Sequence, residues 1–174
     1  GAVSGGIDVL IYSAGSWTPT HVHAWDYMTL ENQIQVNFLG MARSVGLVLP
    51  GMLERDNGII VGLSSASGYV PLPRAEAYGA SKAAALYFLE SLRVDLRSSG
   101  VRVVSVCPGF VDTPLTAENE FAMPFMTTTS AAAEAIVGGI ERGSSEIHFP
   151  RRLTVPLRLI GSLPRPMREW VIGT

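Results

Sequence analysis

The sequence predicts an α/β fold built on a doubly wound parallel sheet, and three observations lead to this prediction. Short β-branched runs alternate with longer segments of helical period, as expected when crossover helices join parallel strands. The apolar fraction is 47% and the charged fraction 16%, which favours a sheet buried on both faces over a solvated helical bundle. With 174 residues, the chain is expected to form one domain over residues 1–150, followed by an Arg/Pro-rich segment over residues 151–174.

The strands are predicted from short apolar runs that end at turn residues. The first run ends at Ala14-Gly15 and the third at Pro108-Gly109, so both are expected to open into tight turns. Parallel strands of this kind bring their carboxyl ends to one edge of the sheet, where ligands bind. The four strands are expected at residues 7–13, 59–64, 101–107 and 146–149.

The helices are predicted from apolar residues that recur every three or four positions. The first is expected at residues 27–49 and to be closed by Pro50-Gly51, because proline disrupts a helix interior. The others are expected at residues 77–98 and at about 130–142. Residues 110–126 are predicted to form a long loop or lid, in which Glu118 and Glu120 are solvated.

Composition and charge narrow the classes of function. The net charge of −2 gives no electrostatic reason to expect nucleic acid as a partner. The single cysteine, Cys107, lies inside an apolar run, which predicts a buried, inert thiol and a reducing compartment. No secretory pattern is visible, and no uninterrupted apolar run reaches the roughly 18 residues that span a bilayer. We therefore expect a cytoplasmic protein.

Tyr78 and Lys82 form the most informative pair in the chain. They are four residues apart on a predicted helix, so they share one face. A free tyrosine ionises about three pH units too high for acid–base work at neutral pH, a gap of roughly 4 kcal/mol. An ammonium about 4–5 Å away supplies roughly 3–4 kcal/mol at an effective dielectric of about 20. The pair alone fits an ordinary helix turn with an aromatic–aliphatic contact equally well.

Four further segments, taken with this pair, resemble the short-chain dehydrogenase/reductase family. Residues 8–15 resemble its Asp-x-x-x-Asn-Asn-Ala-Gly segment, and residues 36–40 match its Val-Asn-x-x-Gly motif. Ser65 stands thirteen residues before Tyr78, at the position of the family's catalytic serine, and residues 108–113 resemble its Pro-Gly-x-x-x-Thr loop. The resemblance implies a Rossmann-like fold and an oxidoreductase that moves a hydride between a nicotinamide cofactor and a secondary alcohol or ketone.

The resemblance also implies the catalytic roles. Tyr78 is expected to exchange a proton with the oxygen of an alcohol or ketone substrate. Lys82 is expected to lower the pKa of Tyr78 and to hydrogen-bond the nicotinamide ribose. Ser65 is expected to hold the substrate oxygen, and Asn37 to anchor a water that connects Lys82 to bulk solvent. The hydride chemistry belongs to the cofactor, which the protein positions.

The cofactor implied by the resemblance is NAD or NADP, and no metal is expected. Ala14 and Gly15 would let it approach the backbone closely. Pro108, Gly109, Val111 and Thr113 would flank the nicotinamide carboxamide. The partners implied are a small-molecule alcohol or ketone substrate and further copies of the chain. A homodimer or tetramer is expected, because the helices at residues 27–49 and 77–98 often pair across a two-fold interface in the family.

The sequence departs from the family pattern in two places. Tyr12-Ser13 replaces the usual Asn-Asn, so side-chain amides are missing at that turn. The family's Thr-Gly-x-x-x-Gly-x-Gly turn, which holds the pyrophosphate, and the residues that choose between NAD and NADP are absent from the sequence. We therefore expect an N-terminally incomplete fold that binds dinucleotide weakly on its own, with strand 7–13 as an apolar edge.

Other functions compete with this interpretation. A fold that lacks its nucleotide half could be a non-catalytic binding or scaffold module. Residues 62–66 superficially suggest a serine hydrolase, but the second glycine of Gly-x-Ser-x-Gly is missing. His21-x-His23 with Asp26 could ligate a metal, although such histidines more often flank a pocket.

Two groups of residues could shape a substrate pocket. Aromatic and methionine side chains could cover an apolar substrate or could simply pack within the lid. Residues 151–174 could lie on a membrane or cover the pocket, but we favour a semi-ordered segment that faces a partner. The candidate pocket residues are Trp17, Trp25, Tyr69, Phe110, Phe121, Met123, Phe125 and Met126.

Overall fold

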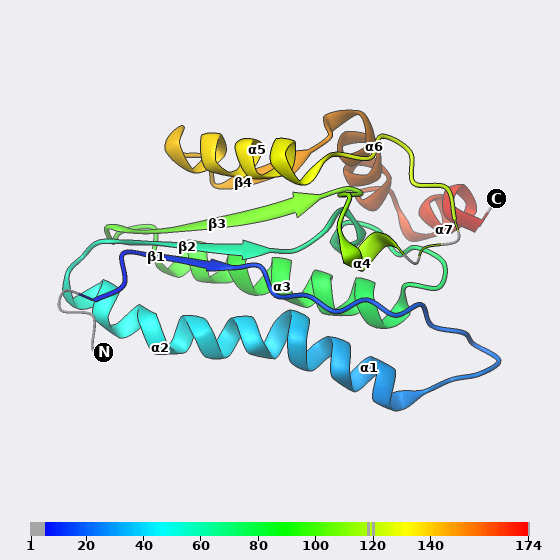
Figure 1. Cartoon of the computed structure of the whole chain (residues 1–174), viewed down its shortest axis with the longest axis horizontal. Helices are drawn as coiled ribbons and strands as arrows, with labels where there is room; N and C mark the ends of the chain where they lie inside the picture. The colour runs from blue at the N-terminus through cyan, green and yellow to red at the C-terminus, as the bar shows by residue number, and fades with distance from the viewer. Residues whose placement is uncertain (1–5, 118, 120, 174) are drawn as a thin grey trace.

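A four-stranded parallel sheet forms the middle layer of the computed structural model, which describes residues 6–117, 119 and 121–173. The strands lie in the order β1-β2-β3-β4 and all neighbours are parallel. Helices α1, α2 and α3 cover one face and α5 covers the other (Figure 1). The predicted doubly wound α/β fold is therefore confirmed. The strands are β1 (Val9–Tyr12), β2 (Gly58–Leu63), β3 (Val101–Pro108) and β4 (Glu146–Phe149).

One continuous helical run crosses the lower layer. It consists of α1 (Tyr27–Ile34), a π-helical turn η1 (Gln35–Leu39) and α2 (Gly40–Glu54). Asp26 caps it, because its carboxylate accepts hydrogen bonds from the backbone amides of residues 28 and 29. By length and composition this run could cross a membrane, with a mean hydropathy of 1.4. In the structure its buried face packs into the protein core.

The first helix does not end at Pro50, as we expected from the sequence. Helix α2 continues through Pro50 to Glu54. A proline inside a helix cannot donate to the carbonyl four residues earlier, which here belongs to Gly46. Gly46 is exposed, so water can hydrate that carbonyl and the helix tolerates the lost bond.

Close packing joins this layer to the sheet through Gly62 of β2. A Cβ atom at Gly62 would lie 2.6 Å from Cδ1 of Leu89 and 2.9 Å from Sδ of Met41. Leu89 belongs to α3 (Glu76–Asp95) and Met41 to α2, and both are fully buried. The glycine therefore lets both helices approach the strand that precedes Ser65.

A second apolar cluster lies on the opposite face of the sheet. There α5 (Thr129–Glu141) begins after Thr128, whose hydroxyl accepts from the amide of Ala131 at 3.3 Å. Two short helices, η2 (Ala66–Gly68) and α4 (Pro114–Ala117), lie in the loops that follow β2 and β3. The buried residues of this cluster are Val61, Val104, Val106, Ala132, Ile147 and Phe149.

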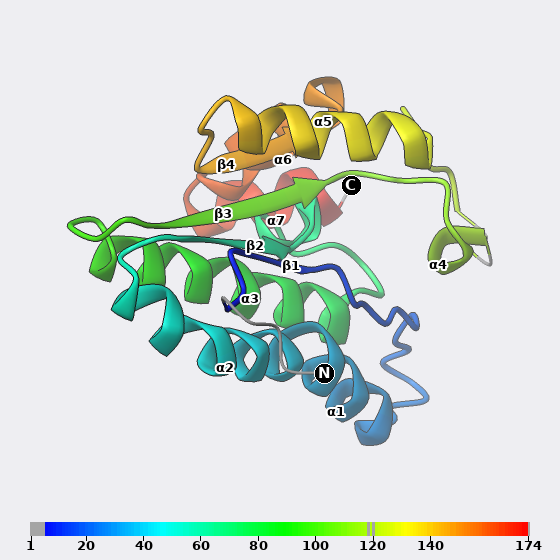
Figure 2. The same ribbon diagram turned by 60° about the vertical axis from the view of Figure 1, so that its left-hand side comes forward.

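The C-terminal segment is helical rather than semi-ordered. It forms α6 (Arg151–Gly161) and α7 (Arg165–Gly173) near the carboxyl ends of the strands (Figure 1). The turned view shows α6 next to β4 (Figure 2). Arg158 on α6 pairs with Glu146 on β4 at 3.0 Å. Because α6 packs against β4, this helix belongs to the part of the fold that surrounds the site.

Candidate active site

A cavity of about 870 Å³ lies beyond the carboxyl ends of the strands. Ser65, Tyr78 and Gly109 line it, three of the residues expected there from the sequence. They come from the loop after β2, from α3 and from the loop after β3. Their meeting at one edge follows from the parallel topology, which brings all strand ends to the same side.

Ser65 follows the buried end of β2 and begins the short helix η2. Its backbone is extended (φ −166°), and its Oγ accepts a hydrogen bond from the amide of Ser67 at 3.2 Å. This N-cap contact fixes the hydroxyl at the cavity wall. The neighbouring Ser64 is buried and donates instead to the carbonyl of Lys82 at 2.7 Å, so the two serines serve different elements.

Tyr78 lies in the first turn of α3 and is held from two sides. The ring of Trp17 contacts it edge-on, with centroids 5.0 Å apart and planes at 79°. The Nζ of Lys82 lies 5.6 Å from the centroid of the Tyr78 ring. The side chain of Ser65 lies close enough to the Tyr78 hydroxyl to influence its pKa. The structure thus brings three of the four expected catalytic side chains together beside the cavity, which Ser65 and Tyr78 line.

The pKa of Tyr78 is raised rather than lowered. Burial is the main cause, and the neighbouring side chain of Ser65 offsets part of the rise. Burial also lowers the pKa of Lys82 to about 8. The expected lowering by Lys82 is not seen, because desolvation disfavours the charged form of both groups and the ammonium lies over the ring. Tyr78 is therefore a phenol, a proton donor, at neutral pH.

Lys82 is 4% exposed, and its Nζ donates to the carbonyl of Leu63 at 3.0 Å. That carbonyl belongs to the last residue of β2, so the strand end fixes the position of the ammonium. Lysine has three N–H donors, and the described residues offer this one hydrogen-bond acceptor. Two donors therefore remain for a ligand or water.

Asn37 lies in the π-helical turn η1 and is fully buried. Its Nδ2 donates to the carbonyl of Ser16 and to Oγ of Ser81, each at 2.9 Å, and its Oδ1 accepts from the amide of Ser16 at 2.7 Å. The side chain therefore holds the loop after β1. Both N–H groups of Nδ2 are already used in these bonds. The expected water could therefore bind Asn37 only by donating a hydrogen bond to Oδ1 or to the backbone carbonyl.

The loop after β1 brings Gly15 close to both of these polar residues. A Cβ atom at Gly15 would lie 3.7 Å from Oδ1 of Asn37 and 3.8 Å from Nζ of Lys82. Ala14 and Gly15 are exposed, so their backbone is open to a ligand. Tyr12, which stands where the family has asparagine, donates its hydroxyl to the carbonyl of Val36 at 2.6 Å. The tyrosine thus also ties this strand end to the helical layer.

The remaining predicted cofactor residues lie on the loop after β3. Pro108 ends the strand, and the amide of Gly109 donates to the carbonyl of Phe149 at 2.7 Å. The carbonyl of Val111 accepts from the hydroxyl of Thr116 at 2.6 Å, and that hydroxyl also accepts from the amide of Thr113 at 3.2 Å. These bonds shape the loop. Gly109 is the residue of this group that lines the cavity.

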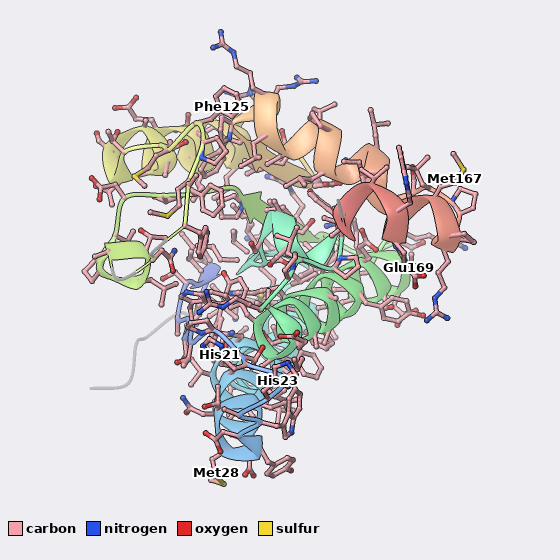
Figure 3. All side chains as sticks on the ribbon, turned by 90° about the vertical axis from the view of Figure 1, so that its right-hand side faces the viewer. His21, His23, Met28, Phe125, Met167 and Glu169 are labelled. Carbon is pink, nitrogen blue, oxygen red and sulfur yellow. The ribbon has the colours of Figure 1, made fainter. Side chains whose placement is uncertain are left out.

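The apolar lining confirms part of the predicted pocket. Trp17, Phe110 and Phe121 line the cavity, and Nε1 of Trp17 donates to Oδ1 of Asn119 across it at 2.7 Å. Phe125 is 52% exposed and points outward in Figure 3. The other predicted members do not line the cavity; they are Trp25, Tyr69, Met123 and Met126. Glu118 and Glu120 lie outside the described residues.

Sequence reasoning offered residues 151–174 as a cover for the pocket but favoured a segment that faces a partner, and the structure shows that α6 supplies a wall of the cavity. Leu153 and Leu157 line the cavity, four residues apart on one face of the helix. A Cβ atom at Gly109 would lie 2.7 Å from Cδ2 of Leu153, so the wall meets the loop after β3 directly. The four-residue spacing of these leucines was a usable signal, but the arginines and prolines around them concealed it.

The alternative sites lack the geometry that they need. The carboxylate of Asp26 caps α1, and among the described residues no three potential ligands gather as a metal site would require. His21 and His23 lie on the exposed loop before α1 (Figure 3). Cys107 is buried, and burial raises its pKa to about 12, which agrees with the expected inert thiol.

Comparison with known protein families identifies residues 2–123 as matching the description "short chain dehydrogenase". A protein of Myxococcus xanthus described as an uncharacterized oxidoreductase is 43% identical over 166 residues, which are 95% of this chain and 66% of that protein. A very-long-chain 3-oxoacyl-CoA reductase of Anas platyrhynchos is 38% identical over 112 residues, 63% of this chain and 36% of that enzyme.

Among solved structures, a short-chain dehydrogenase of Burkholderia cenocepacia in complex with NADP superimposes with a TM-score of 0.83. Its identity to this chain is 25%, and the match covers 97% of this chain and 71% of that one. The chain thus spans just under two thirds of the Myxococcus protein and a smaller share of the reductase from Anas.

Proposed function

The chain belongs to the short-chain dehydrogenase family. We propose that it acts as an NAD(P)-dependent oxidoreductase that interconverts a secondary alcohol and a ketone. The observation that carries the proposal is that Ser65 and Tyr78 line an apolar cavity and that the Nζ of Lys82 lies over the Tyr78 ring. A phenol, a hydroxyl and a buried ammonium at strand ends suit the movement of one proton.

The residues present fit the nicotinamide half of such a cofactor. Lys82 has two N–H donors without a protein acceptor among the described residues, which suits a ribose diol. The exposed backbone of Gly15 lies beside it, with Lys82 and Asn37 both within 4 Å of a Cβ atom placed there. Val111 and Thr113 lie on the loop after β3, where the family holds the carboxamide. When bound, the cofactor supplies or accepts the hydride.

The protein's own residues manage the proton. During reduction Tyr78 gives its phenolic proton to the carbonyl oxygen, while the carbonyl carbon receives the hydride and its electron pair. During oxidation both transfers reverse. Ser65 holds the same oxygen through its hydroxyl and keeps it within reach of the phenol. Trp17 packs edge-on against Tyr78 and limits the movement of its ring.

The cavity favours ketones with an extended apolar group. Its wall is formed by large side chains from three loops and α6, and its volume of about 870 Å³ exceeds the needs of a small ketone. One relative is named for the reduction of 3-oxoacyl thioesters with very long chains, which also pairs a ketone with an apolar chain. The apolar wall residues are Trp17, Leu72, Phe110, Leu115, Phe121, Leu153 and Leu157.

The test follows NADPH and NADH absorbance in the presence of medium-chain ketones. The substitution Tyr78→Phe removes the proton donor but keeps the ring that packs on Trp17, so activity should fall by at least about a hundredfold. Far-UV circular dichroism should remain unchanged. Tyr27→Phe, at an exposed tyrosine of α1 outside the cavity, is the matched control and should keep full activity.

Three results would count against the proposal. An unchanged rate in Tyr78→Phe would remove the proton donor from the mechanism. Cofactor binding without turnover of any ketone would favour the non-catalytic binding module instead. The absence of both binding and turnover in the folded 174-residue chain would show that this chain does not perform the reaction by itself.

A further inference from the structure

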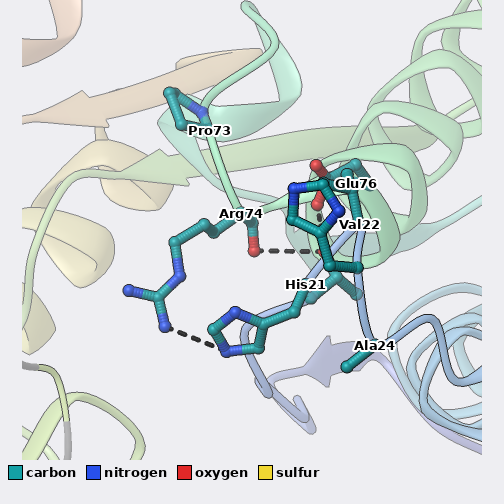
Figure 4. Close-up of a pocket in the computed structure, with 8 residues that line it drawn as sticks. His21, Val22, Ala24, Pro73, Arg74 and Glu76 are labelled. Atoms are coloured by element: carbon teal, nitrogen blue, oxygen red, sulfur yellow. Dashed lines mark hydrogen bonds between the residues drawn. The ribbon is translucent and has the colours of Figure 1, made fainter.

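The rim of the cavity carries a polar pair, Arg74 and His21, that the proton transfer does not use. Nη2 of Arg74 donates to Nε2 of His21 at 3.2 Å (Figure 4). A guanidinium can only donate, so Nε2 of His21 is the acceptor in this contact. The ion pairs among the described residues are Arg158–Glu146 and Arg165–Glu169, so no carboxylate neutralises Arg74 there.

This pair stands where two hollows meet. Arg74 and His21 line the main cavity and also an outer hollow of about 470 Å³. Thr20, His23 and Glu76 line only the outer hollow. An elongated ligand that extends from Tyr78 toward solvent through this opening therefore passes the guanidinium of Arg74.

The backbone holds Arg74 at this junction in an unusual conformation. Its φ is +62°, a region that residues other than glycine rarely adopt. The amide of Thr20, which is 6% exposed, donates to the Arg74 carbonyl at 3.0 Å, and the Thr20 hydroxyl contacts the carboxylate of Glu76. The loop before α1 thus anchors the backbone of Arg74.

We propose that Arg74, oriented by His21, binds a carboxylate at the end of the substrate remote from the reacting carbonyl. This inference rests on the proposed function, because it places that carbonyl at Tyr78. A guanidinium has five N–H donors and binds a carboxylate through two of them. One donor is used by His21, and the others have no protein acceptor among the described residues.

The substrate class follows from the spacing and the charges. Tyr78 lies four positions after Arg74, which limits their backbone separation to about 14 Å. A keto acid with several methylene groups between its carbonyl and carboxylate spans such a distance. Glu76 lines the outer hollow, so a singly charged carboxylate meets less repulsion there than a doubly charged phosphate.

The experiment compares 8-oxononanoate with its uncharged methyl ester by isothermal titration calorimetry. The acid should bind the unmodified chain about ten times more tightly than the ester, as expected for one charge-assisted pair. Arg74→Asn removes the charge with a residue that tolerates positive φ, and it should reduce the ratio to about one. Arg74→Lys should retain part of it. Arg97→Asn, at an exposed arginine outside both hollows, is the control and should retain all of it.

The outcomes separate this inference from the proposed function. Equal binding of acid and ester, no binding of the acid, or an unchanged ratio in folded Arg74→Asn would overturn the carboxylate site. Tighter binding of 8-oxononyl phosphate than of the acid would also overturn it. Reduction of the ester without preference for the acid would leave the oxidoreductase intact, whereas Arg74-dependent binding of the acid without turnover would leave only the carboxylate site.

Discussion

Burial acts in opposite directions on the two ionisable groups of the site. It raises the pKa of Tyr78, because a phenolate is disfavoured away from water, and lowers the pKa of Lys82 to about 8, because an ammonium is disfavoured there. At neutral pH the site therefore holds a neutral phenol beside a charged lysine. This state suits the reduction that we propose, in which Tyr78 gives a proton and the ammonium stabilises the phenolate that forms.

The pH dependence of ketone reduction should reveal the pKa of Lys82. Because that pKa is lowered to about 8, Lys82 is charged below this pH and loses its charge above it, while Tyr78 stays protonated throughout. We expect kcat/KM for reduction to be constant from about pH 6 to 7.5 and to fall about tenfold per pH unit well above pH 8. Initial rates with NADPH across this range provide the measurement.

The reverse reaction supplies the control. Alcohol oxidation needs Tyr78 to accept a proton, and its raised pKa keeps the phenolate fraction small, so the oxidation rate should increase with pH over the same range. A reduction rate that increases through pH 8 would contradict the assignment of the proton donor to Tyr78.

At the residue scale, the sequence indicated which side chains form the site, but it did not predict their pKa values. The spacing of Tyr78 and Lys82 and the position of Ser65 indicated side chains that lie near one another in the structure, whereas their catalytic roles stay predictions. Their pKa values depend on how completely other elements exclude water. Trp17, which packs against Tyr78, comes from a loop about sixty residues earlier in the chain, and local spacing does not report such a contact.

At the element scale, α6 depends on a small polar network that attaches it to the sheet. The hydroxyl of Tyr69 donates to Oε1 of Glu146 on β4 at 2.5 Å, and Nη1 of Arg158 on α6 reaches the same oxygen at 3.0 Å. The Arg158 guanidinium also lies 5.8 Å from the Tyr69 ring centroid. Burial raises the pKa of Tyr69, so its hydroxyl keeps the proton that it donates.

Removing that hydroxyl should weaken both the fold and the cavity wall. We expect Tyr69→Phe to lower the free energy of unfolding by about 1–2 kcal/mol, because Glu146 loses a donor in a partly buried position. The affinity for a long ketone should also fall, because α6 carries Leu153 and Leu157. Urea unfolding and KM measurements provide the test.

The matched control for this substitution is Tyr27→Phe, because Tyr27 is 61% exposed on α1 and its substitution should change stability by less than about 0.5 kcal/mol. Equal stability of the two variants would show that the network of Tyr69, Glu146 and Arg158 does not hold α6 against the sheet.

Elements were predictable where their signals are local. The strand at residues 146–149 and the helix that carries Tyr78 agree with the structure to within a few residues. The π-helical turn at Asn37 was not predicted, because one extra residue in a turn leaves the apolar period almost unchanged. Helix α6 was not predicted either, because its apolar side chains face a cavity that forms only when the loops after the strands come together.

At the scale of the whole molecule, apolar side chains among the described residues are exposed on the edge strand of the sheet and on helix α3. β1 is the edge strand of the described sheet, where Val9 is 45% and Ile11 is 51% exposed. On the opposite side of the helical layer, α3 presents Tyr87 and Val94, seven residues apart and therefore on one face. Exposed apolar side chains that gather on one helix face are typical of association surfaces.

We expect two copies of the chain to associate through this outer face of α3, in agreement with the pairing of helices that the family resemblance implies. Tyr87 is 74% and Val94 63% exposed, so contact between copies would bury both. Light scattering after size exclusion should give about twice the monomer mass of 18.6 kDa. Tyr87→Glu should shift the protein to the monomer, because a carboxylate buried at the interface is costly.

Leu159→Glu provides the control for this charge, because Leu159 is 64% exposed on α6, away from the proposed surface. It introduces the same carboxylate at a similarly exposed apolar position and should leave the dimer mass unchanged. A monomeric unmodified chain, or a Tyr87→Glu variant that still has the dimer mass, would exclude α3 as the contact. Dissociation by Leu159→Glu alone would instead assign the association to the C-terminal helices.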